Sequence, residues 1–341
     1  MDLYIFPTRA STTNGYSIAV LSDFKRMQPA VDDLVIWYVI KDAASSVLKP
    51  ADRIIKRPKA LSLIRAMNVL KNRVSCELSS HSLNLIPVDQ VERIFCGDII
   101  MYRTLRNLFP DKLIIVRFHN CFMRIGNRLK ILDLNINLRF KINLNALSKL
   151  EKEIFKDTNA FKIFISEEDG DYYKLMMGKV SDFKVWSFEP DMEKVKLNRL
   201  GTHMSNKIVW FGGMDSHKTD SVKWFIDFVF NKLQKSLPDI EFHLWGVGSE
   251  MFNNPSKHIY GHGFYDKDGL PLCGESLYIN PDIIGGGVKI KLLSYFEAGA
   301  PFITTPYGFE GYSKDLIDGK YCQVVEMDKW FETIRLLLKP V

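Results

Sequence analysis

The chain has no uninterrupted apolar run of about 18 residues, which is the length that a membrane-spanning helix requires. Its first residues, MDLYIFPT, lack the basic segment and apolar stretch of a secretory signal, so we expect a protein that stays in the cytoplasm. No internal repeat or low-complexity tract is visible. The five cysteines are scattered without a C-x-x-C spacing, which argues against a disulfide framework and against a zinc site: Cys76, Cys96, Cys121, Cys273 and Cys322.

Positive charge is present but unevenly distributed. Residues 51–150 contain 18 lysines or arginines against 7 acidic residues, whereas residues 201–341 contain 14 against 17. A basic first half favours an anionic membrane surface, at about 1 kcal/mol per basic side chain. Nucleic acid is the rival partner, but the sequence offers no recognition helix, RNP-type aromatics or zinc finger. We therefore expect peripheral association with the inner face of the plasma membrane, partly through a basic helix at residues 60–70 that fits a lipid interface and a core position equally.

Short apolar runs alternate with longer helical patterns, which is typical of an α/β fold with parallel sheets. In a first domain, residues 1–188, we predict strands at 2–6, 35–39, 93–95, 99–102, 113–116 and 161–165. The polar residues 189–206 lack periodicity and suit a linker. In a second domain, residues 207–341, we predict strands at 208–211, 241–245, 276–279 and 302–304, and helices near 220–235 and 288–298. The last helix is expected to pack back on the first domain.

The segment from residue 285 to residue 311 has the features of a phosphate site. Three glycines at 285–287 remove every Cβ from a turn, so backbone N–H groups can approach an anion closely. The next residues have helical apolar spacing, and the first turn of such a helix directs free N–H groups and its positive dipole end at the anion. Lys289 and Lys291 add positive charge. Glycine turns and solvated lysines also occur without any ligand, so this pattern alone does not identify a site.

Other candidate residues fall at the same edge of the predicted sheets. In parallel α/β folds, ligands bind beyond the carboxyl ends of the strands. The residues that follow predicted strands there are Gly15, His119, Gly212, Gly213, Gly248, Gly285–Gly287 and Glu310. Their convergence on one edge supports a binding cleft more strongly than any single motif.

The segment GGGVKIKLLSYFEAGAPFITTPYGFEG resembles the donor-binding signature of GT-B glycosyltransferases, in particular the large, mostly retaining family that makes bacterial surface polysaccharides. Further segments resemble the family in the same order along the chain: IIVRFHN at 114–120, FISEED at 164–169, IVWFGGM at 208–214, HLWGVG at 243–248 and GHGF at 261–264. The resemblance implies a GT-B fold, with two Rossmann-like domains facing each other across a cleft and the nucleotide sugar on the second domain.

Roles on the donor side follow from this resemblance. Backbone N–H groups of Gly286 and Gly287 would hold the donor diphosphate, and Gly212, Gly213 and Gly248 would line its site. Lys291 matches the family's lysine and Lys289 the basic residue before it, so we expect Lys291 above all to neutralise the departing phosphates. Side chains two residues apart on a helix point about 200° apart, so both lysines reach one phosphate only if Lys289 precedes the helix. Glu310 would accept hydrogen bonds from donor hydroxyls, or is a surface glutamate.

The first domain would supply the acceptor side. His119 would bind a hydroxyl of the transferred sugar or, in an inverting mechanism, take the acceptor's proton. The alternative is a histidine that only fastens its loop. Asn120 would shape the same loop, and Gly15 would let a neighbouring loop approach the sugar.

Three positions depart from the family pattern. Ser294 stands where the family has the second glutamate of a pair that binds the ribose, and Gly286 stands where the pair's first member is expected. Ile283 occupies a place that is often basic. These departures put the recognition of ribose and the identity of the nucleotide in doubt.

The sequence therefore predicts a hexosyltransferase-type GT-B enzyme that moves a sugar from a nucleotide donor to a glycan or lipid-linked glycan, in the synthesis of a cell-surface polysaccharide such as lipopolysaccharide. Retention is expected from the resemblance. No cofactor or metal is expected, because lysines and a helix N-terminus can do the work of a divalent cation. The alternatives are a nucleotide-sugar epimerase of the same fold and a non-catalytic binding subunit.

Overall fold

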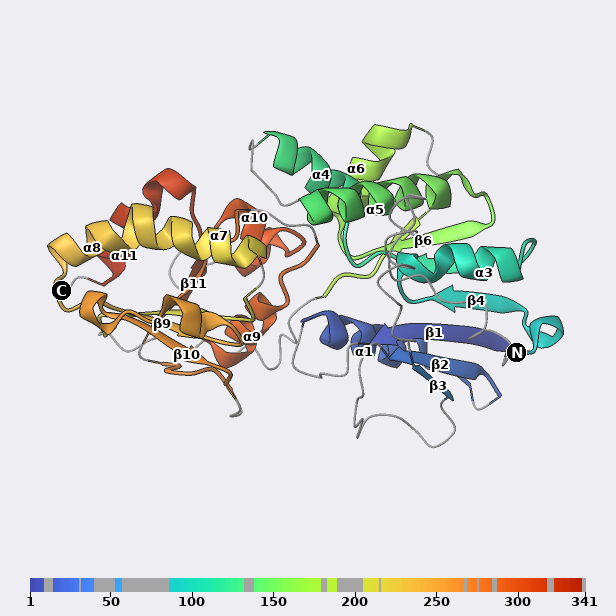
Figure 1. Ribbon diagram of the computed structural model, residues 1–341, viewed down its shortest axis with the longest axis horizontal. Coiled ribbons are helices and arrows are strands. Elements are labelled where there is room, and N and C mark those ends of the chain that lie inside the picture. The colour runs from blue at the N-terminus through green and yellow to red at the C-terminus, as the bar shows by residue number, and fades with distance from the viewer. Residues whose placement is uncertain are drawn as a thin grey trace. The chain divides into compact units, whose positions relative to one another are not determined.

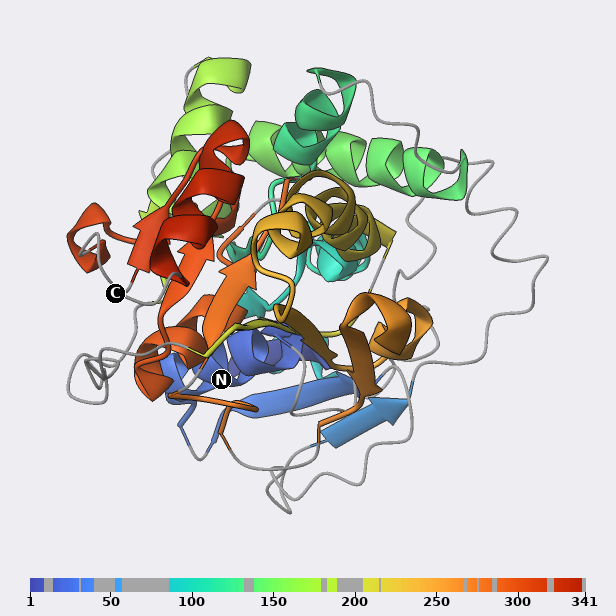
Figure 2. The same ribbon diagram turned by 90° about the vertical axis from the view of Figure 1, so that its left-hand side faces the viewer.

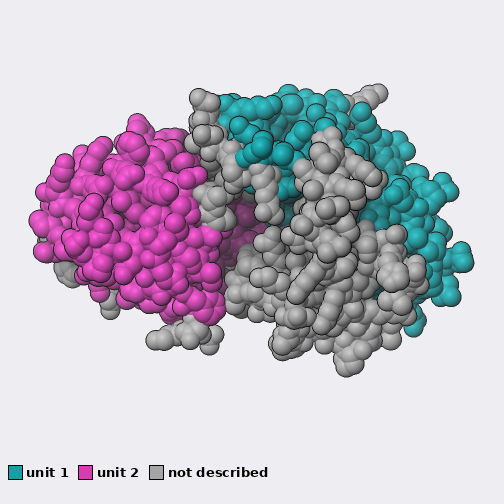
Figure 3. All heavy atoms as spheres, in the orientation of Figure 1, with its two compact units in different colours: residues 1–187 teal, residues 188–341 magenta. Residues whose placement is uncertain are grey.

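The chain forms two compact units, residues 1–187 (unit 1) and residues 188–341 (unit 2), coloured separately in Figure 3. The computed structural model describes residues 1–8, 15–30, 32–39, 53–56, 86–131, 138–178, 183–188, 205–214, 216–265, 269–274, 276–283, 287–317 and 322–338. The predicted linker and the basic helix predicted at residues 60–70 lie largely or wholly outside these residues.

Seven parallel strands form the sheet of unit 1, in the order β3-β2-β1-β4-β5-β6-β7 (Figure 1). They are β1 (Asp2–Thr8), β2 (Leu34–Val39), β3 (Arg53–Lys56), β4 (Arg93–Cys96), β5 (Ile114–Arg117), β6 (Ala160–Phe164) and β7 (Phe183–Val185). Successive side chains of β1 point to opposite faces, so Leu3 and Ile5 join one buried cluster while Tyr4 and Phe6 join another. Both faces of the sheet are therefore covered, as a parallel sheet requires.

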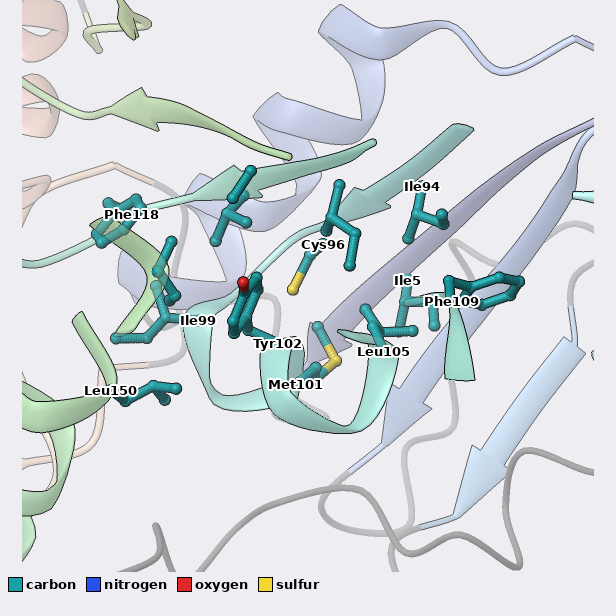
Figure 4. Packing of buried hydrophobic residues seen from close by; sticks show 14 of the residues in the cluster. Ile5, Ile94, Cys96, Ile99, Met101, Tyr102, Leu105, Phe109, Phe118 and Leu150 are labelled. Atoms are coloured by element: carbon teal, nitrogen blue, oxygen red, sulfur yellow. The ribbon is translucent and has the colours of Figure 1, made fainter. Parts of the chain in front are cut away.

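Helices cover the two faces of this sheet. They are α1 (Gly15–Met27), α3 (Tyr102–Leu108), α4 (Phe122–Ile131), α5 (Leu138–Lys156) and α6 (Glu167–Met177), with short 3₁₀ turns η2 (Val88–Gln90) and η3 (Ile99–Met101). Val20 of α1 packs in the cluster of Tyr4 and Phe6. On the other face, Met101 and Leu105 lie against strand residues such as Ile5 (Figure 4).

Unit 2 contains six parallel strands in the order β10-β9-β8-β11-β12-β13. They are β8 (Lys207–Phe211), β9 (Glu241–Trp245), β10 (Ile259–Gly263), β11 (Leu277–Asn280), β12 (Phe302–Thr304) and β13 (Cys322–Val324). The helices are α7 (Ser216–Phe225), a π-helical turn η4 (Ile226–Phe230), α8 (Asn231–Ser236), α9 (Lys291–Ala298), α10 (Pro306–Phe309) and α11 (Trp330–Leu337), with 3₁₀ turns η5 (Ser249–Phe252), η6 (Pro255–Lys257), η7 (Lys314–Leu316) and η8 (Met327–Lys329).

The sheet of unit 2 is also covered on both faces. Trp210 and Phe242 pack with Phe225 and Trp330 on the face of α7 and α11. Tyr295 of α9 packs against the opposite face, in ring contact with Tyr278 and Phe302. The last helix, α11, is thus part of the core of unit 2 and contacts α8 and η4, beside which it lies in Figures 1 and 2. Its predicted packing on the first domain stays a prediction.

The predicted α/β fold with parallel sheets is confirmed, and most predicted strands lie within two residues of observed ones. Residues 99–102 were wrongly predicted as a strand, since they form η3 and the start of α3. The carboxylate of Asp98 accepts a hydrogen bond from the N–H of Ile100 at 3.0 Å, which is the capping contact that starts a helical turn. The short edge strands β3, β7 and β13 were missed, and the edge strand β10 was indicated only by the family-like segment GHGF at 261–264. Across the described residues, no helix is both long and apolar enough to cross a membrane.

Candidate functional site

Two glycine loops meet at the carboxyl edge of the unit 2 sheet, where its parallel strands end. The N–H of Gly212, just after β8, donates to the carbonyl of Trp245 at 2.9 Å, and the N–H of Met214 donates to the carbonyl of Val247 at 2.9 Å. A Cβ on Gly246 would clash with the carbonyl oxygen of Gly212, and Gly246 has a φ of +127°. This backbone contact requires glycine.

Gly213 and Gly248 lie in the same two loops. A Cβ on Gly213 would meet no heavy atom within 4 Å, so this position borders open space. Gly248 adopts the left-handed conformation with a φ of +87°. The predicted glycines after β8 and β9 are thus brought together, and they present main chain rather than side chains at this edge.

The next strands of the sheet end in buried polar groups. The hydroxyl of Thr305, just after β12, donates to the carbonyl of Asp282, just after β11, and accepts a hydrogen bond from the N–H of Gly308 at 2.9 Å. Asn280, the last residue of β11, donates from its side chain to the hydroxyl of Thr304 at 3.0 Å. These bonds fix the loops that carry the predicted phosphate turn and Glu310.

Lys291 lies at this edge as the first residue of α9. Its Nζ is 3.2 Å from Oδ1 of Asp282 and 5.3 Å from the centre of the Trp210 ring. Both charged side chains are nearly buried, with 11% of Lys291 and 4% of Asp282 exposed. Burial lowers the pKa of Lys291, and Asp282 opposes that shift. A buried ammonium beside glycine loops is a charge that an anionic ligand can use.

Lys289 precedes α9 rather than lying on it. Its Nζ donates to the carbonyl of Gly287 at 3.1 Å, and its own carbonyl accepts the hydroxyl of Tyr312 at 2.9 Å. The condition for both lysines to reach one phosphate is therefore met. Gly287 has a φ of +68°, whereas Gly285 and Gly286 lie outside the described residues.

The helix begins later than the sequence suggested. The apolar pattern from residue 288 indicated a first turn with free N–H groups, but α9 starts at Lys291. The N–H groups of Leu292 and Leu293 donate to the carbonyls of Lys289 and Ile290, at 2.8 and 3.0 Å. Lysine side chains and the glycine turn thus become the main candidates for binding an anion here.

Sequence reasoning missed two charged residues of this edge. Asp282 was not assigned a role, and neither was Lys218, in the first turn of α7, whose charge also lowers the pKa of Lys291. The available signal for Lys218 was its place in the first helical turn after the glycine loop of β8, five residues beyond Gly213. Ser294 lies half-buried on α9, and Glu310 directly follows α10, also half-buried.

The predicted residues of unit 1 lie at the carboxyl edge of its own sheet. His119 follows β5 and is 8% exposed; its Nε2 is 3.0 Å from the carbonyl oxygen of Gly97, which follows β4. Burial and the nearby charge of Arg117 lower the pKa of His119 to about 3, so the imidazole is neutral. Because a carbonyl only accepts, Nε2 carries the proton and Nδ1 is the acceptor of the ring.

A buried charge network adjoins His119. Arg117 is fully buried and donates to Oδ2 of Asp23 at 2.8 Å, to the carbonyl of Phe164 at 2.6 Å and to the carbonyl of Trp186 at 2.8 Å. Oδ2 of Asp23 is also 3.6 Å from Nε2 of His119. His119 thus lies beside the Arg117–Asp23 ion pair, whose hydrogen bonds connect α1, β5, β6 and the segment after β7.

The loop of His119 leads directly into α4. The two side-chain oxygens of Glu151, on α5, accept the N–H groups of Phe122 and Met123 at 2.7 and 2.8 Å, at the start of that helix. Asn120 lies half-buried between His119 and α4, and Gly15 is the first residue of α1. The structure thus keeps all three predicted acceptor-side residues on unit 1, at or near the ends of its strands.

Comparisons with known proteins agree with this architecture. Residues 205–339 match the family described as glycosyl transferases group 1. No curated protein matches the chain in sequence.

Among solved structures, the chain is similar to the sucrose-phosphate synthase of Thermosynechococcus elongatus, with a TM-score of 0.63 and 13% identity over 99% of this chain and 90% of that one. It is also similar to Anabaena HepE in complex with UDP, with a TM-score of 0.57 and 12% identity over 99% and 89% of the two chains. A third similar structure is WaaG, a glycosyltransferase involved in lipopolysaccharide biosynthesis, with a TM-score of 0.57 and 13% identity over 99% and 90%. At these identities the likeness establishes the fold.

The predicted GT-B architecture is therefore confirmed for the whole chain. Residues 205–339 match the glycosyl transferases group 1, which supports glycosyl transfer, and both units share the GT-B fold of the similar structures.

Proposed function

We propose that this enzyme transfers a sugar from a nucleoside-diphosphate sugar to a glycan or lipid-linked glycan in the synthesis of a cell-surface polysaccharide. The observation that carries the proposal is the pair of lysines at the start of α9, Lys289 and Lys291, beside the glycine loops of β8 and β9. Two of the similar structures contain a uridine nucleotide: HepE is in complex with UDP, and a trehalose-6-phosphate protein of E. coli is bound with UDP-2-fluoro glucose. The polysaccharide role rests on the likeness to WaaG.

Glycosyl transfer places growing negative charge on the departing diphosphate. Ammonium groups fixed in a poorly solvated site stabilise that charge more in the transition state than in the ground state. We propose that Lys291, with Lys289 and Lys218, supplies this stabilisation without a metal ion. We further propose retention, in which the departing phosphate takes the acceptor's proton on the same face and His119 binds a sugar hydroxyl.

A nucleotide screen tests the donor proposal. Thermal unfolding is measured with each nucleoside diphosphate and its sugars, and we expect one base to raise the melting temperature at ligand concentrations well above its Kd. Product analysis with and without acceptor then separates transfer from epimerisation, because an epimerase forms product from the donor alone. Failure of every nucleotide to bind would favour a non-catalytic subunit.

We propose that unit 1 docks on anionic membrane. Ile131, the last residue of α4, and Leu138, the first residue of α5, are 81% and 72% exposed. The exposed Lys130 and Lys141 lie close to them in the sequence. Apolar side chains beside lysines suit the boundary between acidic headgroups and acyl chains.

Co-sedimentation with acidic and neutral vesicles tests this docking. Binding to acidic vesicles should weaken sharply as the Debye length shrinks from about 30 Å at 0.01 M salt to about 8 Å at 0.15 M. The double change Lys130→Glu/Lys141→Glu should reduce binding. The matched control is Lys232→Glu/Lys235→Glu on the exposed surface of α8, which alters the net charge equally and should leave binding nearly unchanged if the site is specific to unit 1.

A further inference from the structure

The buried ion pair between Asp282 and Lys291 is not explained by phosphate binding alone. An anion site gains affinity from positive charge, yet a carboxylate stands 3.2 Å from the ammonium of its central lysine. A carboxylate at this place weakens the field that a diphosphate would feel. Its presence therefore calls for a role that outweighs this cost.

The surroundings of Lys291 provide that role. Burial disfavours the charged ammonium, and the neighbouring charges of Lys218 and Lys289 disfavour it further. Asp282 acts in the opposite direction, both through its charge and through its hydrogen bond with Nζ. Without it, Lys291 would lose its proton at a lower pH than it does in the wild type.

Asp282 is itself held firmly. Its carbonyl accepts the hydroxyl of Thr305, whose position is fixed by the N–H of Gly308. The N–H of the next residue, Ile283, donates to the hydroxyl of Ser221 on α7 at 3.4 Å. The carboxylate is thus anchored between the end of β11, the start of α10 and α7, and it can fix the direction of the Lys291 ammonium.

The ammonium keeps bonding capacity in this arrangement. It has three N–H donors, of which one is directed to Asp282, while the face of Trp210 lies 5.3 Å away as a cation–π partner. A donor therefore remains for a phosphate oxygen. The three lysines and the one aspartate together carry a net charge of two, which balances the charge of a nucleotide-sugar diphosphate.

We propose that Asp282 is a positioning residue of the donor site, which keeps Lys291 charged and directed toward the diphosphate. This inference rests on the proposed function, because it assumes that Lys291 binds the donor phosphates. It predicts that Asp282 has opposite effects at low and high pH. While Lys291 stays protonated, the negative charge of Asp282 repels the anion, and an asparagine oxygen could position the ammonium equally well. Once Lys291 can lose its proton, the charge of the carboxylate sustains binding.

Calorimetry with two probes, inorganic pyrophosphate and UDP, tests the proposal from about pH 6 to about pH 10. In Asp282→Asn, affinity at the acidic end should equal or exceed that of the wild type, and its fall at alkaline pH should move down by about one pH unit or more. The two affinity curves should therefore cross or diverge with rising pH. Titration of the probes themselves is common to all proteins and cancels in the comparison.

Further variants make the result specific. Asp282→Glu keeps the charge and should restore most of the alkaline affinity. In a Lys291→Met background, Asp282→Asn should no longer shift the pH dependence. Asp328→Asn, which removes one exposed carboxylate of the same unit, should behave as wild type. If Asp282→Asn does not fold, Asp282→Glu in the presence and absence of Lys291 takes its place, with a smaller shift that must vanish in Lys291→Met.

The outcomes separate the two levels of the proposal. Identical pH profiles for wild type and Asp282→Asn would overturn the role of Asp282 while leaving the phosphate site standing. Unchanged pyrophosphate and UDP affinity in Lys291→Met would instead remove Lys291 from the phosphate site, and with it the basis of the proposed function.

Discussion

The two units bury charge at the same edge of their sheets but use it differently. In unit 1 the guanidinium of Arg117 is fully enclosed and donates to Asp23, to the carbonyl of Phe164 on β6 and to the carbonyl of Trp186 just after β7. In unit 2 the ammonium of Lys291 has one carboxylate partner, Asp282, and lies beside loops built from glycine. An arginine whose planar fork is filled by protein groups stabilises structure, whereas a lysine with a remaining donor can serve a ligand.

This contrast separates two kinds of buried polar group that look alike in a sequence. Arg117 is the last residue of β5 and Lys291 is the first residue of α9, and both belong to α/β units of similar topology. What distinguishes them is whether the fold itself satisfies the charge. The following changes test that distinction, in order of decreasing effect.

Arg117→Met should unfold unit 1 most severely. It leaves the buried carboxylate of Asp23 without its guanidinium, which costs about 3–5 kcal/mol of unfolding free energy. Urea denaturation measures the loss. The matched control is Arg93→Met, because Arg93 pairs with Asp2 at 2.7 Å but is 67% exposed, and an exposed pair contributes less than about 1 kcal/mol. Equal losses in the two variants would contradict the assignment of Arg117 as a structural charge.

His119→Ala tests whether unit 1 also has a chemical role. We expect sugar transfer to fall by about 10²-fold while the affinity for bare UDP, held by unit 2, stays nearly constant. Turnover and calorimetry on the same preparation measure the two effects. A loss of activity that only parallels a lower melting temperature would mean that His119, through its contact with Gly97, merely fastens its loop.

Lys291→Ala should lower turnover at least about tenfold with the fold intact, because it removes a charge-assisted bond of about 1.5–3 kcal/mol to the departing diphosphate. Steady-state kinetics with the donor measures the loss. Lys329→Ala serves as control, since Lys329 is exposed on η8 of the same unit. Unchanged kinetics for Lys291→Ala would contradict the assignment of Lys291 to the phosphate site.

The smallest effect concerns the pH dependence of stability. The pKa of His119 is about 3 in the folded protein and about 6.5 when unfolded, so the unfolded chain binds more protons between these values. The contribution of His119 is therefore fully present above pH 6.5 and is lost as pH falls, by about 1 kcal/mol between pH 6.5 and pH 5.5. His119→Gln keeps a donor for Gly97 but does not titrate, and it should reduce this acid sensitivity. Parallel stability curves for the two proteins would show that His119 is not neutral and buried.

Local patterns were enough to predict most of the fold. Short apolar runs between helical patterns placed strands such as 241–245 and 302–304 at their observed positions. They failed at residues 99–102, where the apolar run has strand composition but the carboxylate of Asp98 starts a helical turn instead. The hydrophobic composition of residues 99–102 does not reveal the capping hydrogen bond between Asp98 and Ile100.

The candidate site was only partly predictable, for a different reason. Lys289 and Lys291 could be found because they adjoin a glycine turn in the sequence. Asp282 acquires its meaning only from the Nζ of Lys291, and Arg117 only from Asp23, 94 residues earlier in the chain. Such pairs form when strand order is set, so no local pattern contains them.

Glu151 affects where an anionic ligand can bind on unit 1. Its side-chain oxygens already engage the N–H groups of Phe122 and Met123, the place at the start of α4 where an external anion would otherwise bind. The side chain of Glu151 thus occupies the N–H groups that a phosphate would need at the start of α4, the helix that follows His119. If the donor binds unit 2 as proposed, this arrangement disfavours a second phosphate site beside the loop of His119.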